Sequence, residues 1–365
     1  MIKILETGAS QRQPASANGP AEHIDYEALY AELRDAVRGE VHVSDAYRAM
    51  YSTDAANYRQ IPIAVVLPKD AGDAQRAMQI CHAHGAPVTP RGGGTSLTGA
   101  SCNTTVIFDY SKYMNHILEI DYERAIARVE PGVVLDDLRA EAERHGLTFG
   151  PAPSTHNRCA IGGMFGNNAC GMPAQFSGRM EENVYDAQVL LYDGTRMRVG
   201  PTPPHRLEAI IRDGGREGEI YARLRDIADR YGTLVEERFP KIPRRVSGYN
   251  LNELSRTQGF NVARALTGSE GTIVHVLELT LRLVPHPPCT AMAIVGFEDI
   301  ATAGDHVPYC NTHMPYALEG MDETLFQHMQ EKGQNPHRQH ELFPEWHAWL
   351  ILHFGSSTEA QAEEK

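Results

Sequence analysis

The sequence lacks several patterns that identify well-known classes of protein. No run of about 18 apolar residues occurs, so no membrane-spanning helix is expected. The six cysteines are scattered and form no C-x-x-C pair, which argues against a zinc ribbon, an iron–sulfur cluster or a disulfide framework within this chain. Lys and Arg together (34) are fewer than Asp and Glu (47), and the resulting net charge of −13 argues against binding to nucleic-acid phosphates.

The first residues also lack the apolar core of a signal peptide. We therefore expect a cytoplasmic protein, with peripheral attachment at the inner membrane as the alternative. Glycine (32) and proline (22) are plentiful, while apolar residues make up 42% and charged residues 22% of the chain. These values are typical of a globular protein, and the clustered glycines and prolines favour a loop-rich α/β or α+β fold over a helical bundle.

The distribution of apolar and turn residues divides the chain into four parts. A run of prolines at 285–288 marks the main boundary, because proline cannot continue a strand or helix. The large part before it separates into subdomains at about 58–115 and 116–287. We expect a disordered leader (1–22), a helical segment (23–57), one large domain (58–287) and the start of a further α/β unit that stops in mid-fold (288–365).

The expected elements follow from hydrophobic periodicity and turn signals. In the first subdomain, a helix capped by Asp70 lies between the strands 63–67 and 87–90, and this segment with a further strand at 105–109 predicts a small parallel unit. The second subdomain is expected to contain strands 116–120, 125–130, 189–192, 195–199 and 277–283, with helices over 133–145 and around 220–231. The last part is expected to contain strands 291–297, 316–321 and 347–354, with helices near 299–307, 323–331 and after Thr358.

The strongest chemical signal is the segment Pro90-Arg-Gly-Gly-Gly-Thr-Ser-Leu-Thr-Gly99. Three consecutive glycines allow backbone N–H groups to approach an anion closely, and Thr95, Ser96 and Thr98 add hydroxyl donors. A diphosphate fits this donor set. The segment is not a Walker loop, because no Gly-Lys-Ser/Thr follows, and it lacks the G-x-G-x-x-G setting of a Rossmann site. The alternative is a Gly-rich surface turn.

Two further segments are unusual. Residues 150–171 have the sequence G-P-A-P-S-T-H-N-R-C-A-I-G-G-M-F-G-N-N-A-C-G, which is too rich in Gly and Asn for a regular element. A loop of this length in a compact domain usually has a function. Its small residues allow a flat ring to lie against the backbone, and Asn167 and Asn168 can bond ring heteroatoms; the alternative is a packed Ω-loop. The third segment, Leu266-Thr-Gly-Ser-Glu-Gly-Thr-Ile-Val274, is a turn that leads into a long alternating strand.

These three segments, in this order, resemble the FAD-linked oxidases of the vanillyl-alcohol oxidase (p-cresol methylhydroxylase) type. Within that family the chain is similar to the 2-hydroxy-acid dehydrogenase branch, which includes D-lactate dehydrogenase, D-2-hydroxyglutarate dehydrogenase and the flavin subunit of glycolate oxidase. It is especially similar to the N-terminal flavin part of large bacterial proteins that also carry an iron–sulfur module. The resemblance covers residues 45–354. It implies an α+β fold in which two subdomains of the PCMH type hold FAD, followed by an incomplete cap domain.

The resemblance also implies which residues bind the cofactor. Arg91 to Leu97 would surround the diphosphate, and since no histidine occurs in that loop, FAD is expected to be non-covalent. An iron–sulfur cluster is expected only in a C-terminal part beyond this chain or in a partner. The full set of expected FAD-binding residues is Arg91, Gly92, Gly93, Gly94, Thr95, Ser96, Leu97, Ser154, Thr155, Gly162, Gly163, Asn167, Gly171, Val184 and Ile273.

The substrate side carries fewer signals. Arg244 and Arg245 begin the segment R-R-V-S-G-Y-N-L, which resembles a family stretch near the flavin, and a guanidinium can bind a carboxylate through two hydrogen bonds. The alternative is a solvated arginine pair. The segment His337-x-x-His340-Glu341 has metal-ligand residue types, but it lies in a polar loop and no metal is expected there. No general base is assigned, because in the relatives it belongs to a later part of the cap.

Three hypotheses of function remain at this point. The first is FAD-dependent oxidation of a small D-2-hydroxy acid by hydride transfer to flavin N5, with electrons passed to an iron–sulfur centre, a quinone or a carrier protein. The second is a non-catalytic flavin-binding subunit that needs a partner chain. The third is a reductase on the same fold that uses NADPH, such as the enolpyruvyl reductase of cell-wall precursor synthesis.

Overall fold

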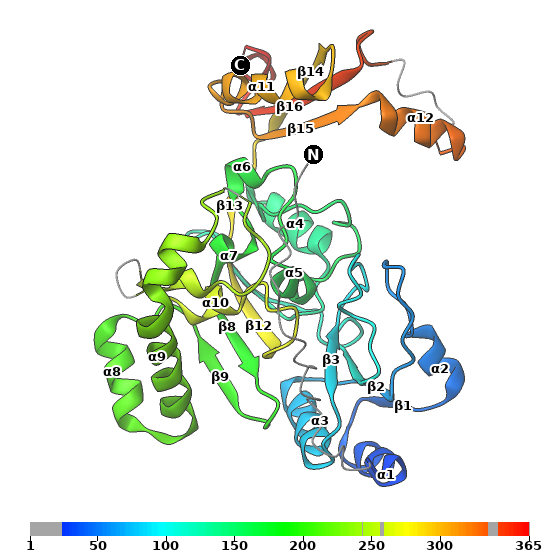
Figure 1. Cartoon of the computed structure of the whole chain (residues 1–365), viewed down its shortest axis with the longest axis vertical. Helices are drawn as coiled ribbons and strands as arrows, with labels where there is room; N and C mark the ends of the chain where they lie inside the picture. Colours follow the sequence, from blue (N-terminus) through cyan, green and yellow to red (C-terminus); the bar gives the residue numbers. More distant parts are fainter. Residues whose placement is uncertain (1–23, 243, 256–258, 335–341, 365) are drawn as a thin grey trace, which may run out of the picture.

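The computed structural model describes residues 24–242, 244–255, 259–334 and 342–364. The expected leader, residues 1–22, lies outside these ranges. Three sheets and their helices account for most of the described chain, and Figure 1 shows the third of them at one end of the molecule, apart from the other two. The mixture of helices and sheets confirms the expected α+β class.

The first sheet has the strand order β1-β2-β4-β3. β2 and β3 both pair with β4 in parallel, and β1 pairs with β2 antiparallel. The expected strands and helix are confirmed, but β4 lies between β2 and β3, so the strand–helix–strand segment is not a directly paired unit. A crossover through a helix leaves room for one more strand, and β4 occupies it. The bounds are β1 (Glu40–His42), β2 (Ala64–Leu67), β3 (Val88–Arg91), β4 (Val106–Asp109) and α3 (Ala71–Ala83).

The N-terminal segment covers this sheet rather than standing apart from it. It contains the expected helix α1 (Tyr26–Ala36), a second helix α2 (Asp45–Met50) and the strand β1. Leu29 and Leu33 of α1 pack against the apolar face of α3, in one core with Val66 and Phe108. Residues 24–57 therefore contain two helices and also contribute an edge strand to the first sheet.

The second sheet is antiparallel throughout, with the order β5-β6-β12-β8-β9. Along β12, Leu279 and Leu281 are buried in the main core, while Glu278 faces the other side with Arg128 and Arg198 as ion-pair partners. This alternation confirms the sequence pattern. The bounds are β5 (Ile117–Asp121), β6 (Ile126–Val129), β8 (Val184–Leu190), β9 (Arg196–Val199) and β12 (His275–Arg282).

A buried histidine lies where the two sheets meet. His275, the first residue of β12, is 2% exposed, and its Nδ1 is 2.8 Å from the Tyr110 hydroxyl. Its ring also lies edge-on to Phe108 at 5.2 Å between centroids. Burial lowers the pKa of His275 to about 3, because the imidazolium would lose its hydration. The junction therefore requires a neutral histidine.

Further elements surround the second sheet. The helical hairpin of α8 and α9 was only partly expected, since the sequence indicated one shorter helix around 220–231. α8 begins with a proline at its first position, a common helix start that the sequence analysis missed. The bounds are α4 (Leu135–Glu143), β7 (Leu147–Thr148), α5 (Ile161–Asn167), α6 (Ala174–Ser177), α7 (Met180–Asn183), α8 (Pro204–Asp213), α9 (Gly215–Arg238), η1 (Leu251–Glu253), β10 (Leu254–Ser255), β11 (Gly259–Phe260), α10 (Val262–Leu266) and β13 (Val284–Pro285).

The third sheet contains the strands after the proline run, in the order β14-β16-β15 and antiparallel. It contacts the rest of the molecule where the Phe176 ring of α6 meets Tyr316 at 5.1 Å between centroids. All of its expected strands and helices are confirmed. Among the residues described, no helix is both long and apolar enough to cross a membrane. The bounds are β14 (Cys289–Phe297), α11 (Ile300–Asn311), β15 (Ala317–Asp322), α12 (Glu323–Glu331), β16 (Ala348–Ser356) and α13 (Glu359–Glu363).

Candidate functional site

The first two unusual segments of the sequence lie against each other. The glycine loop leaves the end of β3, and the backbone at Gly92 approaches Ala160 so closely that an added Cβ would be 2.7 Å from the Ala160 Cβ. A Cβ on Gly93 would collide with the carbonyl oxygen of Arg158. Glycine is required at both positions for this approach, because any side chain would push the two segments apart.

The third segment joins the same region. The backbone N–H of Glu270 donates to the carbonyl of Gly166 at 2.9 Å, which ties the turn before β12 to helix α5. A Cβ on Gly271 would lie 2.5 Å from the Pro90 ring, at the end of β3. The fold therefore brings together three segments that are far apart in the sequence.

The glycine loop presents unpaired backbone donors. The N–H groups of residues 92–97, and that of Gly163, donate to no acceptor among the residues that the structure describes. Gly94 has a φ of +63°, the left-handed conformation that reverses the direction of successive N–H groups. Successive backbone N–H groups in this conformation can bind an anion. The donor set fits a diphosphate.

Helix α5 corrects one expectation, since the segment 150–171 does contain a regular element. Ile161, Met164 and Phe165 are buried in the main core, and this burial outweighs the weak helix propensity of the intervening glycines. Glycine is needed at position 162, because an added Cβ there would lie 2.6 Å from the Pro131 Cβ. At Gly163, by contrast, nothing lies within 4 Å of an added Cβ, so this position borders open space.

The other expected cofactor residues divide into accessible and buried positions. Ser154 and Asn167 are exposed, Thr155 and Gly171 are half-buried, and Val184 at the start of β8 is buried. Leu97 and Ile273 are exposed apolar side chains, at 78% and 47%, one on the glycine loop and one in the third segment. Large apolar side chains left exposed beside a donor-rich loop are typical of a binding site.

The two neighbouring asparagines have different surroundings. Asn168 is buried and ends α5 in a left-handed conformation, with its Nδ2 donating to Glu181 Oε2 at 2.8 Å and its Oδ1 accepting from the Glu181 N–H at 3.1 Å. The expectation that Asn168 bonds a ring is therefore wrong, because its amide is already used. Desolvation raises the pKa of Glu181, although Arg179 forms an ion pair with it. Asn167 is exposed and remains a candidate.

The two expected substrate arginines point to different places. Arg244 Nη2 donates to Cys170 Sγ at 2.9 Å, so its guanidinium lies beside the second segment. Arg245 instead donates to Asn252 Oδ1 at 2.7 Å and stacks on the Phe239 ring at 4.9 Å. Arg244 therefore lies beside the second segment, whereas Arg245 belongs to the wall of a separate hollow.

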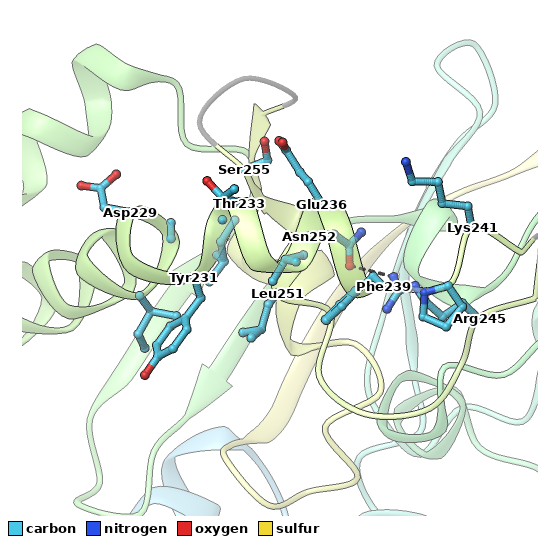
Figure 2. Close-up of a pocket in the computed structure, with 16 residues that line it drawn as sticks. Asp229, Tyr231, Thr233, Glu236, Phe239, Lys241, Arg245, Leu251, Asn252 and Ser255 are labelled. Atoms are coloured by element: carbon cyan, nitrogen blue, oxygen red, sulfur yellow. Dashed lines mark hydrogen bonds between the residues drawn. The ribbon is translucent and has the colours of Figure 1, made fainter.

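That hollow is a pocket of about 720 Å³ between the end of α9 and the η1–β10 segment. Figure 2 shows Tyr231, Glu236 and Lys241 among the residues around it, with the hydrogen bond from Arg245 to Asn252 on one side. None of the expected flavin residues lines it. The pocket is therefore distinct from the convergence of the three segments.

The metal expectation concerns residues outside the described ranges, since His337, His340 and Glu341 are not among them. In the part of the chain that is described, no group of three or more His, Cys, Asp or Glu side chains could hold a metal ion. The six cysteines are free thiols.

The sequence analysis missed the partners of Arg91. Its guanidinium donates to the backbone carbonyls of Thr53 and Ser101 and lies over the Tyr51 ring. Every residue has a backbone carbonyl, so no sequence pattern identifies these acceptors. Tyr51 is the one partner with a distinctive side chain, and it lies far from Arg91 in the sequence.

Comparison with known proteins agrees with this geometry. Residues 62–200 match the family model described as FAD binding domain. The chain is 34% identical over 332 residues to D-2-hydroxyglutarate dehydrogenase of Pseudomonas putida, covering 89% of this chain and 32% of that protein. It is 31% identical over 287 residues to glycolate oxidase subunit GlcD of Bacillus subtilis, covering 77% of this chain and 50% of that protein.

A solved structure of alkyldihydroxyacetonephosphate synthase is similar in fold, with a TM-score of 0.62 at 16% identity over 91% of this chain and 57% of that one. The chain thus spans about a third to a half of the curated relatives named here. The free N–H groups of the glycine loop lie within the matched range. Residues 62–200 therefore form an FAD binding domain, and the chain is similar over most of its length to 2-hydroxy-acid dehydrogenases that include D-2-hydroxyglutarate dehydrogenase.

Proposed function

We propose that this chain binds FAD non-covalently and takes part in the oxidation of a D-2-hydroxy acid of the D-2-hydroxyglutarate or D-lactate type. The observation that carries the proposal is the row of unpaired N–H groups at residues 92–97, placed where three glycine-rich segments meet. The loop contains no histidine that could form a covalent link to the flavin. The similarity to D-2-hydroxyglutarate dehydrogenase supports the class of substrate.

In this proposal the free N–H groups hold the diphosphate, and the open space at Gly163 receives part of the flavin nucleotide. The exposed side chains of Ser154 and Asn167 lie along the same segment and donate hydrogen bonds to it. Leu97 and Ile273 supply apolar contact on either side. The absence of a side chain at Gly92 lets the loop approach Ala160, and its absence at Gly163 leaves room for the cofactor.

When bound, FAD supplies the acceptor for the hydride removed from the substrate carbon. The role of Arg244 is to bind the substrate carboxylate, because its guanidinium is exposed beside the second segment and forms no ion pair with a described carboxylate. Arg245 acts indirectly, by fixing the backbone that carries Arg244. We also propose that residues 58–287 form the cofactor domain and that the third sheet belongs to a substrate cap.

The electrons leave in a second step to an iron–sulfur centre, a quinone or a carrier protein. Such an acceptor is consistent with a cofactor that is reduced by substrate and must be reoxidised. It is supplied by a partner or by another part of a longer chain.

Reconstitution with FAD tests the proposal. Purified protein should bind FAD, and acid precipitation should release all of the flavin into the supernatant. Under anaerobic conditions, D-2-hydroxyglutarate or D-lactate should shift the absorbance spectrum of the bound flavin, with little or no turnover by this chain alone because no general base is assigned to it, while the L-enantiomers serve as matched controls. Flavin that stays on the denatured chain contradicts non-covalent binding, and bleaching by NADPH but by no hydroxy acid would favour the reductase alternative.

A further inference from the structure

The Arg91 guanidinium contacts three protein groups. Nη1 donates to the Ser101 carbonyl at 3.0 Å and Nη2 donates to the Thr53 carbonyl at 2.9 Å. The guanidinium carbon lies 5.3 Å from the centre of the Tyr51 ring, in a cation–π contact. Arg91 therefore ties both ends of the glycine loop to a segment that precedes the first parallel strand.

Tyr51 is itself fixed from two directions. Its hydroxyl donates to Asp109 Oδ2 at 2.7 Å, at the end of β4. Its ring stacks with Tyr47 at 5.8 Å and an interplanar angle of 15°, and the Tyr47 ring stacks on His42 at 3.5 Å and 10°. Burial and the Asp109 carboxylate raise the pKa of Tyr51, so the hydroxyl stays protonated and keeps donating.

The middle of the loop is held by the same segment. The Ala55 N–H donates to the Gly94 carbonyl at 3.0 Å, and Asp54 Oδ2 accepts from the Ser101 hydroxyl at 3.0 Å. All of these bonds use carbonyls and side chains of the loop. The N–H groups of residues 92–97 take no part in them and have no acceptor among the described residues.

We propose that residues 51–55, together with Arg91, form a clamp that holds the glycine loop in the shape that receives a diphosphate. Arg91 is then a positioning residue rather than a ligand of the diphosphate, and the segment 51–55, which lies outside the matched range 62–200, is part of the cofactor site. The inference rests on the proposed FAD binding.

The physical reason is preorganisation. A loop with three consecutive glycines has many accessible conformations, and each residue fixed on binding loses backbone entropy. A loop that is already fixed by the fold does not lose that entropy when the ligand arrives. The geometry of the guanidinium matters here, because two carbonyls in different directions need two separate N–H donors, which a single ammonium group cannot place in the same way.

The experiment compares FAD affinity among variants of the full chain by fluorescence titration of the apoprotein. Arg91→Lys keeps the positive charge but loses the forked donor, and Tyr51→Leu removes the ring and hydroxyl without touching the loop. Arg48→Gln is the matched control, since Arg48 also donates to a backbone carbonyl, that of Pro62, but does not touch the loop. Tryptic cleavage after Arg59 in the apoproteins is measured in parallel.

The clamp predicts that Arg91→Lys and Tyr51→Leu each weaken FAD binding about tenfold or more, with a double variant much less than additive, while Arg48→Gln stays within about twofold. The two clamp variants should also be cleaved faster at Arg59. If Arg91→Lys binds FAD like the wild type, or if Tyr51→Leu has no effect on affinity, the clamp is wrong. Failure of the wild type to bind FAD would instead refute the proposed function.

Discussion

Replacing Gly163 with alanine is expected to weaken cofactor binding without destabilising the fold. Gly163 is the third residue of α5, its N–H is free among the described residues, and nothing lies within 4 Å of a Cβ built there. Gly163→Ala should therefore leave the apoprotein folded and raise its stability by up to about 1 kcal/mol, because alanine is a better helix former. In the FAD complex, the same methyl group occupies space assigned to the nucleotide.

The expected loss follows from the cost of overpacking. An extra methyl group in a filled site typically costs about 1–3 kcal/mol, which corresponds to a loss of FAD affinity of about 5- to 150-fold. Gly232→Ala is the matched control. Gly232 also lies within a helix, α9, and a Cβ there also has nothing within 4 Å, but α9 lies apart from α5 and β3 in Figure 1.

Two measurements check this prediction on each variant: thermal unfolding of the apoprotein and fluorescence titration with FAD. The expected pattern is unchanged or raised apoprotein stability in both variants, with FAD affinity lowered only in Gly163→Ala. Wild-type FAD affinity in Gly163→Ala would show that the open face of α5 is not part of the cofactor site. Equal losses in both variants would point to a general effect of the helix substitutions.

Three further predictions follow from individual contacts. Asn168→Ala should lower the free energy of unfolding by about 2–3 kcal/mol, since Glu181 loses two buried hydrogen bonds. Replacing the exposed Asn167 with alanine should change the free energy of unfolding by less than about 0.5 kcal/mol but weaken FAD binding. Urea unfolding and FAD titration of both variants check this, and equal destabilisation would contradict it. His275 has a folded pKa of about 3 against an ordinary 6.5, so below pH 6.5 the unfolded chain binds a proton that the folded chain does not. The free energy of unfolding should therefore fall as the pH drops from 6.5 towards 3, by up to about 1.4 kcal/mol per pH unit. His275→Gln should flatten the dependence of the urea midpoint on pH, and an unchanged slope would refute the assignment. Arg244→Met should weaken the binding of a D-2-hydroxy acid, followed by the shift it causes in the flavin absorbance spectrum, by about tenfold or more without changing FAD affinity. Unchanged binding of the acid would exclude Arg244 as the carboxylate ligand.

The sequence was sufficient for the parts of the site that depend on residue type. The glycines at 92–94 and the order of the three segments carry a direct physical meaning, because only glycine permits the close approach to Arg158 and Ala160. The long alternation in β12 likewise predicted a half-buried strand. These features are local, and local chemistry determines them.

Other features depend on tertiary contacts that no local pattern carries. Asn167 and Asn168 are identical side chains one residue apart, and only the left-handed end of α5 turns the second one into the core. Helix α5 itself forms because Ile161, Met164 and Phe165 are buried together, against the preference of its glycines. The insertion of β4 between β2 and β3 and the carbonyl partners of Arg91 are also decided by the assembled fold.

Amide hydrogen exchange with and without FAD tests the central claim most directly, because it reports on the backbone N–H groups themselves. In the apoprotein, the amides of residues 92–97 and of Gly163 have no described protein acceptor and should exchange quickly. The account predicts that saturating FAD slows the exchange of these amides strongly and leaves residues 227–241, which line the 720 Å³ pocket, unchanged. Unchanged exchange at residues 92–97, with protection appearing instead at residues 227–241, would contradict it.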